Sequence, residues 1–274
     1  MRVDAHQHFW APSRGDYGWM QASAALAPLR RDVLPEHLAP HLAMHGIDRT
    51  VLVQAAPSVF ETEYLLGLAD ATPWIAKVVG WVDFEQPSDL AHLERFARHA
   101  KFAGVRPMIQ DIADPAWMHR PDVRWAFDAL VDLDLSFDAL GLPLHLDHFR
   151  VLFDRHPQLR SVVDHAMKPA IRDGAFDDWA AGLERIARET PAFCKLSGLL
   201  TEAGADRSDA ALRPYVDHIL SVFGAERVLW GSDWPVLELA GTYDGWFAMA
   251  QRLVPASAAA AVFGRTAQRF YRIA

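Results

Sequence analysis

Short apolar runs alternate with longer helical segments along the whole chain, and this alternation restricts the fold more than any other feature. Eight runs rich in β-branched or apolar residues are predicted to be strands: Arg2–Ala5, Thr50–Gln54, Val78–Val82, Gly104–Met108, Leu135–Ala139, Ser161–Val163, Ala192–Leu196 and Arg227–Trp230. Between them, apolar residues recur at the three- and four-residue spacing of amphipathic helices, as in Leu90–Lys101, Val123–Leu133, Phe176–Arg188 and Arg213–Phe223.

Regular alternation of strand and helix produces parallel strands that are joined by right-handed crossovers. Eight such units in roughly 250 residues are the number that closes a (β/α)8 TIM barrel. We therefore expect an α/β protein with a single barrel domain over residues 1–274, because no low-complexity tract or Gly/Ser-rich linker divides the chain. A doubly wound open sheet is the alternative fold.

Three segments outside this regular pattern also carry expectations. The connection after the first strand, from Ala11 to Pro35, is unusually long and contains Tyr17 and Trp19, so we expect a lid or a wall of the site there. A helix after the fifth strand should begin at Pro143, since proline suits a first helical turn. The segment Ala258–Arg272 should form one or two short helices that close the outer ring of the barrel.

Composition narrows the class of partner. The chain has 35 acidic and 27 basic residues, so its formal net charge is −8, which disfavours nucleic acid and anionic membranes and leaves small molecules. The single cysteine, Cys194, cannot form an internal disulfide, and no apolar signal core or membrane-spanning stretch is present. We therefore expect a cytoplasmic location; the oligomeric state is left open.

In a (β/α)8 barrel the active site lies at the carboxyl ends of the strands, so the residues that leave each strand are the candidates for function. The first strand ends in Asp4-Ala5-His6-Gln7-His8-Phe9-Trp10, and in extended backbone His6 and His8 point the same way. Neutral imidazoles in such a pair suit zinc and similar ions. A pair of hydrogen-bonded structural histidines is the alternative.

Two later strand ends add a histidine and a carboxylate. The sixth strand is followed by Asp164-His165 and the eighth by Gly231-Ser232-Asp233-Trp234-Pro235. Asp233 is flanked by apolar residues and is a candidate general base for activating water. Its alternative role is to cap the following turn. Asp164 is expected to orient or charge His165, or to bond to backbone.

Two cations follow the fourth and seventh strands. The guanidinium of Arg106 suits a substrate carboxylate or a polarised carbonyl, and an internal salt bridge to Asp138 or Asp83 is the equal alternative. Strand alternation places Lys195 and Ser197 on the face opposite Cys194, so Lys195 is a second candidate for binding substrate and Cys194 is not. Three aromatic side chains are candidates for a sugar-sized pocket wall: Trp10, Trp19 and Trp234.

Several familiar catalytic motifs are missing. No GxSxG nucleophile elbow occurs, which removes the main signal of a serine esterase. Neither GxGxxG nor GxxxxGK[ST] occurs, so hydride transfer with a dinucleotide and phosphate-loop chemistry are not expected.

Together, the strand-end motifs, with Lys168-Pro169 and Lys195-Leu196-Ser197-Gly198, resemble the amidohydrolase superfamily in its amidohydrolase-2 branch of fuconolactonase-like sugar-lactone hydrolases. They span nearly the whole chain in the family's order. The resemblance implies hydrolysis of an aldonolactone, such as L-fuconolactone or L-rhamnonolactone, to the open hydroxy acid. Asp233 would activate water, and His6, His8, His165 and Arg106 would stabilise the oxyanion.

One departure concerns the metal. Metal-dependent relatives usually present a carboxylated lysine or a histidine after the fifth strand, where this chain has Phe137-Asp138-Ala139-Leu140, and only His145 follows nearby. We therefore expect no required cofactor, with a single zinc or other divalent ion on His6, His8, His165 and Asp233 as the other possibility. A metal-dependent decarboxylase of the same branch, a hydrolase of a carboxylated pyrone or muconolactone, and a non-catalytic sugar-binding barrel are the alternatives. The net charge of −8 favours a neutral lactone over a carboxylated one.

Overall fold

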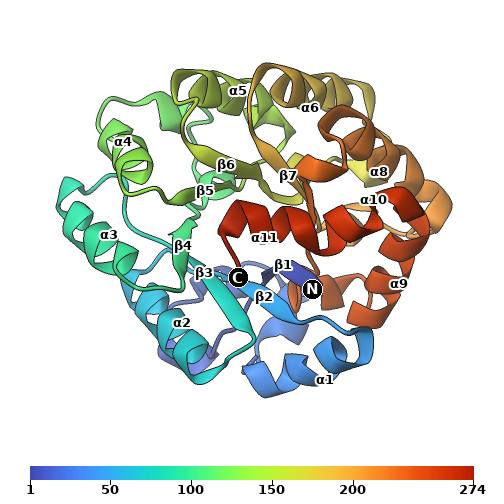
Figure 1. Ribbon diagram of the computed structural model, residues 1–274, viewed down its shortest axis with the longest axis horizontal. Coiled ribbons are helices and arrows are strands. Elements are labelled where there is room, and N and C mark those ends of the chain that lie inside the picture. The colour runs from blue at the N-terminus through green and yellow to red at the C-terminus, as the bar shows by residue number, and fades with distance from the viewer.

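A computed structural model describes residues 1–274, and its centre is a ring of eight parallel strands in the order β1 to β8 (Figure 1). The strands are β1 Val3–Gln7, β2 Arg49–Val53, β3 Ile75–Gly80, β4 Phe102–Val105, β5 Ser136–Ala139, β6 Arg160–Val163, β7 Phe193–Leu196 and β8 Val228–Trp230. Each predicted strand overlaps one of these. The (β/α)8 barrel is therefore confirmed and the open sheet is excluded.

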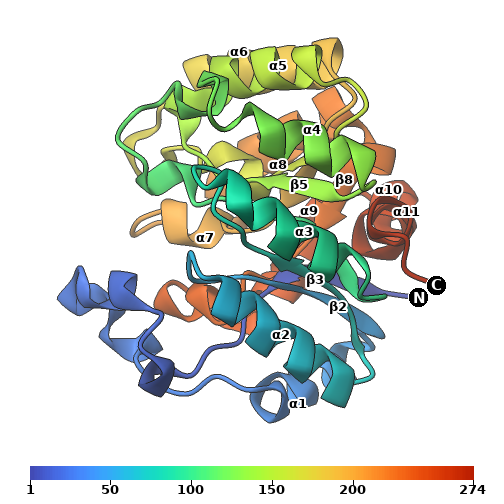
Figure 2. The ribbon, with the colours of Figure 1, turned by 90° about the vertical axis from the view of Figure 1, so that its left-hand side faces the viewer.

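Helices surround the ring, apart from the last one, which lies across one end of the barrel (Figures 1 and 2). They are α1 Pro35–His45, α2 Val59–Ala71, α3 Leu90–Ala97, α4 Arg124–Asp132, α5 Leu146–Arg155, α6 Asp177–Glu189, α7 Leu199–Glu202, α8 Asp209–Phe223, α9 Tyr243–Leu253, α10 Ala256–Ala260 and α11 Thr266–Tyr271. Helix α8 begins four residues before the predicted Arg213, because Ser208 caps it by accepting a hydrogen bond from Ala211 N. The predicted start at Pro143 is a single 3-10 turn that leads into α5.

The ring closes between its first and last strands. Beyond the end of β8, Asp233 N donates to His6 O and His8 N donates to Trp234 O, each at 2.8 Å. This pairing joins the segment after β8 to the end of β1. The backbone bonds that close the barrel therefore also place the Asp233 side chain beside the two histidines of β1.

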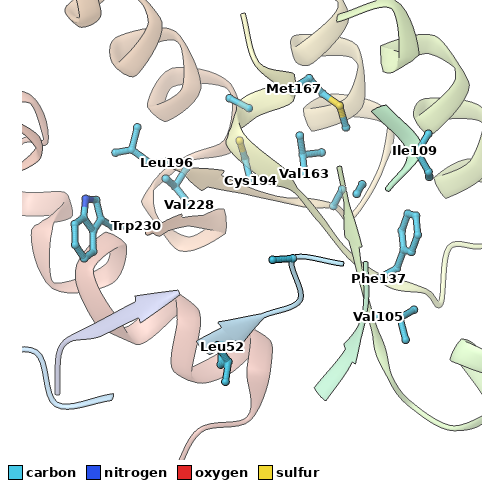
Figure 3. Packing of buried hydrophobic residues seen from close by; sticks show 14 of the residues in the cluster. Leu52, Val105, Ile109, Phe137, Val163, Met167, Cys194, Leu196, Val228 and Trp230 are labelled. Carbon is cyan, nitrogen blue, oxygen red and sulfur yellow. The ribbon is translucent and has the colours of Figure 1, made fainter. Parts of the chain in front are cut away.

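Apolar packing lies on both sides of the strands. The main core fills the space between strands and helices and includes Phe137, Cys194 and Trp230 (Figure 3). Cys194 is completely buried in this cluster and does not line the pocket at the barrel mouth, in agreement with the face expected from strand alternation. A smaller cluster fills the barrel interior and includes Phe270 and Tyr271 of α11. Helix α11 therefore lies across the amino-terminal end of the barrel, where Figure 1 shows it, instead of closing the outer ring as expected.

The long first connection is a fixed wall. It contains the 3-10 turns Pro12–Arg14, Gly18–Gln21 and Ala24–Leu29. Trp10 and Val33 exchange backbone hydrogen bonds of 3.0 and 2.8 Å across its base, and the indole of Trp10 donates to two carbonyls of the same loop. Figure 2 shows it at the end of the barrel away from both termini. No helix in the chain has the length and apolarity needed to cross a membrane.

Candidate functional site

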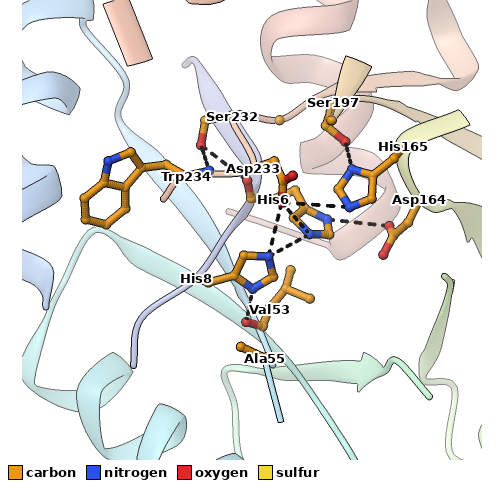
Figure 4. A network of polar contacts seen from close by, with 12 residues as sticks. His6, His8, Val53, Ala55, Asp164, His165, Ser197, Ser232, Asp233 and Trp234 are labelled. Atoms are coloured by element: carbon orange, nitrogen blue, oxygen red, sulfur yellow. Dashed lines mark hydrogen bonds and ion pairs between the residues drawn. The ribbon is translucent and has the colours of Figure 1, made fainter. Parts of the chain in front are cut away.

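Four side chains from three strand ends meet at the carboxyl end of the barrel (Figure 4). His6 and His8 come from β1, His165 follows β6 and Asp233 follows β8. The Nε2 atom of His8 lies 3.2 Å from His6 Nε2 and 3.3 Å from Asp233 Oδ1. His6 Nε2 and His165 Nε2 lie 3.7 and 3.8 Å from the same Asp233 oxygen. The sequence prediction that these four residues gather at one place agrees with this geometry.

The hydrogen bonds around His8 indicate which of its nitrogens carries the lone pair. His8 Nδ1 donates to Val53 O at 2.8 Å, so Nε2 of the neutral ring is free to accept. The contacts of His6 do not select a tautomer, because the guanidinium of Arg106 lies 3.3 Å from its Nε2 and the ammonium of Lys195 lies 3.0 Å from its Nδ1, and both groups can only donate. Burial lowers the pKa of both rings and keeps them neutral. The centre is therefore rich in acceptors and attracts a cation.

This donor set fits a single metal ion. A tetrahedral zinc site with bonds of 2.0–2.1 Å places its ligand atoms about 3.3 Å apart. The distances of 3.2–3.8 Å among the four donor groups are close to that value. His6, His165 and Asp233 each offer one ligand atom within 4.8 Å of the others, and His8 lies beside them, 3.2 Å from His6 and 3.3 Å from Asp233.

Asp233 is held as a carboxylate. Its burial alone would raise its pKa, but the charged form of His165, and a hydrogen bond from His8 when that ring is protonated, outweigh burial and lower the pKa well below its ordinary value, so this carboxyl group loses its proton before the imidazoles do. The pKa of His165 is lowered to about 4, mainly by burial. At neutral pH the site therefore presents one buried carboxylate among neutral imidazoles, which is a state in which Asp233 can accept a proton.

Both Asp233 and His165 have left-handed backbone. The φ angle of Asp233 is 58°, and four consecutive residues from His165 to Lys168 have φ between 48° and 60°. A non-glycine residue in this region costs on the order of 1–3 kcal/mol, so the strain is concentrated in the two segments that carry the site. His165 Nδ1 is held 2.8 Å from Ser197 Oγ. A Cβ atom at Gly198 would lie 2.6 Å from the same nitrogen, so glycine is required there.

Lys195 lies below the site and does not reach the pocket. Its ammonium is completely buried, 2.6 Å from Asp138 Oδ2, 2.9 Å from Asp164 Oδ1 and 3.0 Å from His6 Nδ1. Tyr271 of α11 donates to the same Asp138 oxygen at 2.6 Å. The attraction of Lys195 and His6 exceeds the effect of burial and lowers the pKa of Asp164. The geometry therefore gives Lys195 a place under His6 instead of the substrate contact expected from the sequence.

Arg106 has neither of its expected internal partners, Asp138 and Asp83. Its Nη1 lies 3.6 Å from Asp164 Oδ2, and its Nη2 donates to Gln54 Oε1 at 2.9 Å. Gln54 Nε2 in turn donates to Arg106 O at 3.0 Å. These contacts hold the guanidinium at the edge of the open pocket.

The pocket above the four residues has a volume of about 340 Å³. Six of the candidate residues from the sequence line it: His8, Trp10, Trp19, Arg106, His165 and Asp233. Gln110 and Lys168 also line it, and Lys168 Nζ donates to Gln110 Oε1 at 2.6 Å. Trp234 is buried outside it, with its indole donating to Glu238 at 2.9 Å. His145 does not join the site, because its ring accepts a hydrogen bond from Leu142 N.

Sequence reasoning did not identify Glu61, which supports the wall of this pocket. Ser58-Val59-Phe60-Glu61 has the pattern of a helix capping box, in which glutamate would bond to Ser58 N. The carboxylate instead accepts from Ala55 N at 3.0 Å and Ala56 N at 2.8 Å, and Ala55 O accepts from the Trp19 indole at 2.8 Å. Burial raises the pKa of Glu61 to about 8. The Ser-x-x-Glu pattern was the only available signal, and it indicates a cap.

A closed barrel with an aspartate and three histidines at its mouth is consistent with the amidohydrolase class. The family model described as Amidohydrolase matches residues 3–273, and the chain belongs to that family. It is 43% identical to an L-fucono-1,5-lactonase of Burkholderia ambifaria, over 99% of this chain and 96% of the relative. An L-fucono-1,5-lactonase of Burkholderia multivorans is 35% identical, over 100% and 96%. A crystal structure of a B. multivorans amidohydrolase with bound zinc has 35% identity and a TM-score of 0.94 over the whole of both chains. The predicted family and the prediction of a hydrolytic enzyme are confirmed.

Proposed function

We propose that this enzyme hydrolyses a neutral sugar lactone, an aldonolactone such as L-fuconolactone or L-rhamnonolactone, to the open hydroxy acid. The observation that carries the proposal is the Asp233 carboxylate, which is buried among imidazoles at the base of a pocket walled by Trp10 and Trp19. The two relatives named as L-fucono-1,5-lactonases support the class of substrate.

The residues present account for each proton in the reaction. Asp233 takes a proton from water as the water oxygen bonds to the lactone carbonyl carbon. The resulting tetrahedral intermediate then breaks its bond to the ring oxygen, and protonated Asp233 returns the proton to that leaving oxygen. The products are one carboxylic acid and one hydroxyl group, so no other reactant is needed.

Arg106 is the natural stabiliser of the negative charge that develops on the carbonyl oxygen. It lines the pocket and is a permanent donor, whereas the free Nε2 of neutral His8 offers only a lone pair. We therefore assign oxyanion stabilisation to Arg106, and assign His6, His8 and His165 to enclosing the Asp233 carboxylate and holding it in position.

The same histidines and Asp233 would hold one zinc or other divalent ion. When bound, such an ion supplies Lewis acidity toward a carbonyl oxygen. We propose that at most one ion binds and that it is not required. The ammonium of Lys195 already pairs with both Asp138 and Asp164 next to His6, so these two carboxyl groups are not free to hold a second ion.

A panel of aldonolactones, assayed with a pH indicator, tests the proposal. Asp233→Asn keeps the size of the side chain but cannot accept the proton, so turnover on the best lactone should fall by about a hundredfold or more. Asp217→Asn, an exposed aspartate on α8, is the matched control and should retain activity. Wild-type turnover in Asp233→Asn would refute the mechanism. Absence of turnover on every lactone would refute the function.

A further inference from the structure

A second cavity adjoins the proposed catalytic pocket at the mouth of the barrel. Its volume is about 650 Å³, against about 340 Å³ for the catalytic pocket. Both cavities are lined by Trp19, Met108 and Asp111, so they share a wall. Its other walls come from the first connection and from the segments that follow β2, β3 and β4. Loops at this end of the barrel therefore form two neighbouring spaces, and the proposed reaction uses only the smaller one.

We propose that the larger cavity is a saccharide subsite, so that the preferred substrate is a lactone that carries a second, uncharged sugar ring. This inference rests on the proposed lactone hydrolysis and names its substrate class more closely. The catalytic pocket would take the lactone ring, and the adjoining cavity would take the sugar attached to it.

Aromatic faces held in fixed positions are the first support for this assignment. Four aromatic residues line the cavity: Trp19, Trp81, Phe84 and Trp117. Trp117 and Phe84 are only 3% and 2% exposed and support the wall from behind: their rings stack with centroids 5.8 Å apart, and the Trp117 indole donates to Glu85 at 2.7 Å. The accessible aromatic faces are those of the half-buried Trp19 and Trp81. The backbone of Trp81 bonds through both its N and O to Thr62 Oγ1, at 2.8 and 3.0 Å, which fixes the backbone that carries this half-buried indole. The apolar face of a sugar ring packs against aromatic surfaces of this kind.

Charge is the second support. The carboxylates of Asp16, Asp83, Glu85 and Asp111 line the cavity. Arg14 and Arg120, which are not part of the lining, pair with Asp16 and Glu85 at 2.9 and 3.0 Å, so Asp83 and Asp111 are the carboxylates without a basic partner. Carboxylates accept hydrogen bonds from sugar hydroxyls, whereas they repel a carboxylated or phosphorylated group. The combination of aromatic faces with acceptors therefore favours a polyhydroxylated, uncharged ring over an anionic or purely apolar ligand.

Binding the second ring should raise the specificity constant, because contacts away from the reacting bond contribute to transition-state stabilisation. We compare matched pairs: glucono-1,5-lactone against the lactones of cellobionic, lactobionic and melibionic acid. In the wild type at least one disaccharide lactone should exceed its monosaccharide partner in kcat/KM by about tenfold, which corresponds to about 1.4 kcal/mol.

Trp81→Ala should remove this advantage and leave kcat/KM for the monosaccharide lactone within about twofold, because Trp81 does not line the catalytic pocket. Trp81→Gln is the second variant in case the alanine protein is unstable. Phe60→Ala removes an aromatic side chain that is 72% exposed elsewhere, and should change neither rate. Equal constants within every pair, or equal losses on both members in the Trp81 variants, would overturn the subsite.

A binding experiment separates failure of the subsite from failure of the proposed function. Tryptophan fluorescence is titrated with cellobiose and with lactose, neither of which is a lactone. A saturable change in the wild type that is lost in Trp81→Ala supports the subsite even if no lactone is hydrolysed. The absence of any saturable change in the wild type overturns the subsite even if aldonolactones are good substrates.

Discussion

Replacing Glu61 with glutamine should change how the stability of the protein depends on pH. The carboxyl group is completely buried against Ala55 N and Ala56 N, and burial raises its pKa from 4.5 to about 8. Between these two values the folded protein keeps a proton that the unfolded chain has released. The stability contributed by this group is therefore complete below pH 4.5 and is lost as the pH rises toward 8.

The size of this effect follows from one proton. The free energy of unfolding falls by about 1.4 kcal/mol per pH unit within the window, or by about 2 kcal/mol from pH 6 to pH 7.5. Glutamine has nearly the same shape and does not titrate. The difference in unfolding free energy between Glu61→Gln and the wild type should therefore shift by about 2 kcal/mol in favour of the variant over this range.

Urea unfolding, followed by tryptophan fluorescence at several pH values, measures the shift directly. The matched control is Glu63→Gln on the same helix, where the side chain is 42% exposed and paired with Arg95. Its curve should stay parallel to that of the wild type. If the Glu61→Gln curve is also parallel to the wild type, the buried carboxyl group does not retain its proton and the reasoning fails.

Four further outcomes are expected. Lys195→Met leaves the buried carboxylates of Asp138 and Asp164 without their cation, so urea unfolding should show a loss of about 3–5 kcal/mol, and unchanged stability would contradict the ion pairs. The pKa of His165, lowered from 6.5 to about 4, contributes stability that is complete above pH 6.5 and lost as the pH falls toward 4; His165→Gln should flatten that acid limb in the same assay. Metal analysis should find at most one equivalent of divalent ion, with activity persisting in chelator; two equivalents, or a complete loss restored by zinc, would disprove this. A neutral aldonolactone should show a higher kcat/KM than a carboxylated pyrone lactone, and the reverse order would make Arg106 the anchor of a substrate carboxylate.

The fold could be predicted because a barrel repeats one unit, so the period of the pattern and the number of its repeats are both visible in the sequence. The convergence of His6, His8, His165 and Asp233 followed from the rule that strand ends meet at one mouth. The closure of the ring through Asp233 N and His6 O adds a constraint that no strand pattern contains.

Depth along the barrel axis could not be predicted. Strand alternation correctly turns Lys195 inward, but it does not say how far below the mouth a residue lies, and Lys195 is one layer too deep to meet substrate. The direction of Trp234 could not be predicted either. Because Asp233 has left-handed backbone, its side chain points into the pocket while the side chain of Trp234 does not. Glu61 was missed because its partners, Ala55 and Ala56, are backbone amides, which have no sequence signature.

The pairing of the first strand with the last has a consequence for synthesis of the protein. His8 and Asp233 are 225 residues apart, so a ribosome that adds about 5–20 residues per second needs roughly 11–45 s to make the second after the first. During that time β1 has no neighbour on the side where β8 will pair, and the nascent chain has an unprotected strand edge. A chain truncated before β8 lacks Asp233, and one that starts after β1 lacks His6, so neither contains all four site residues. Catalytic competence should therefore arise in one late step, when the last strand pairs with the first.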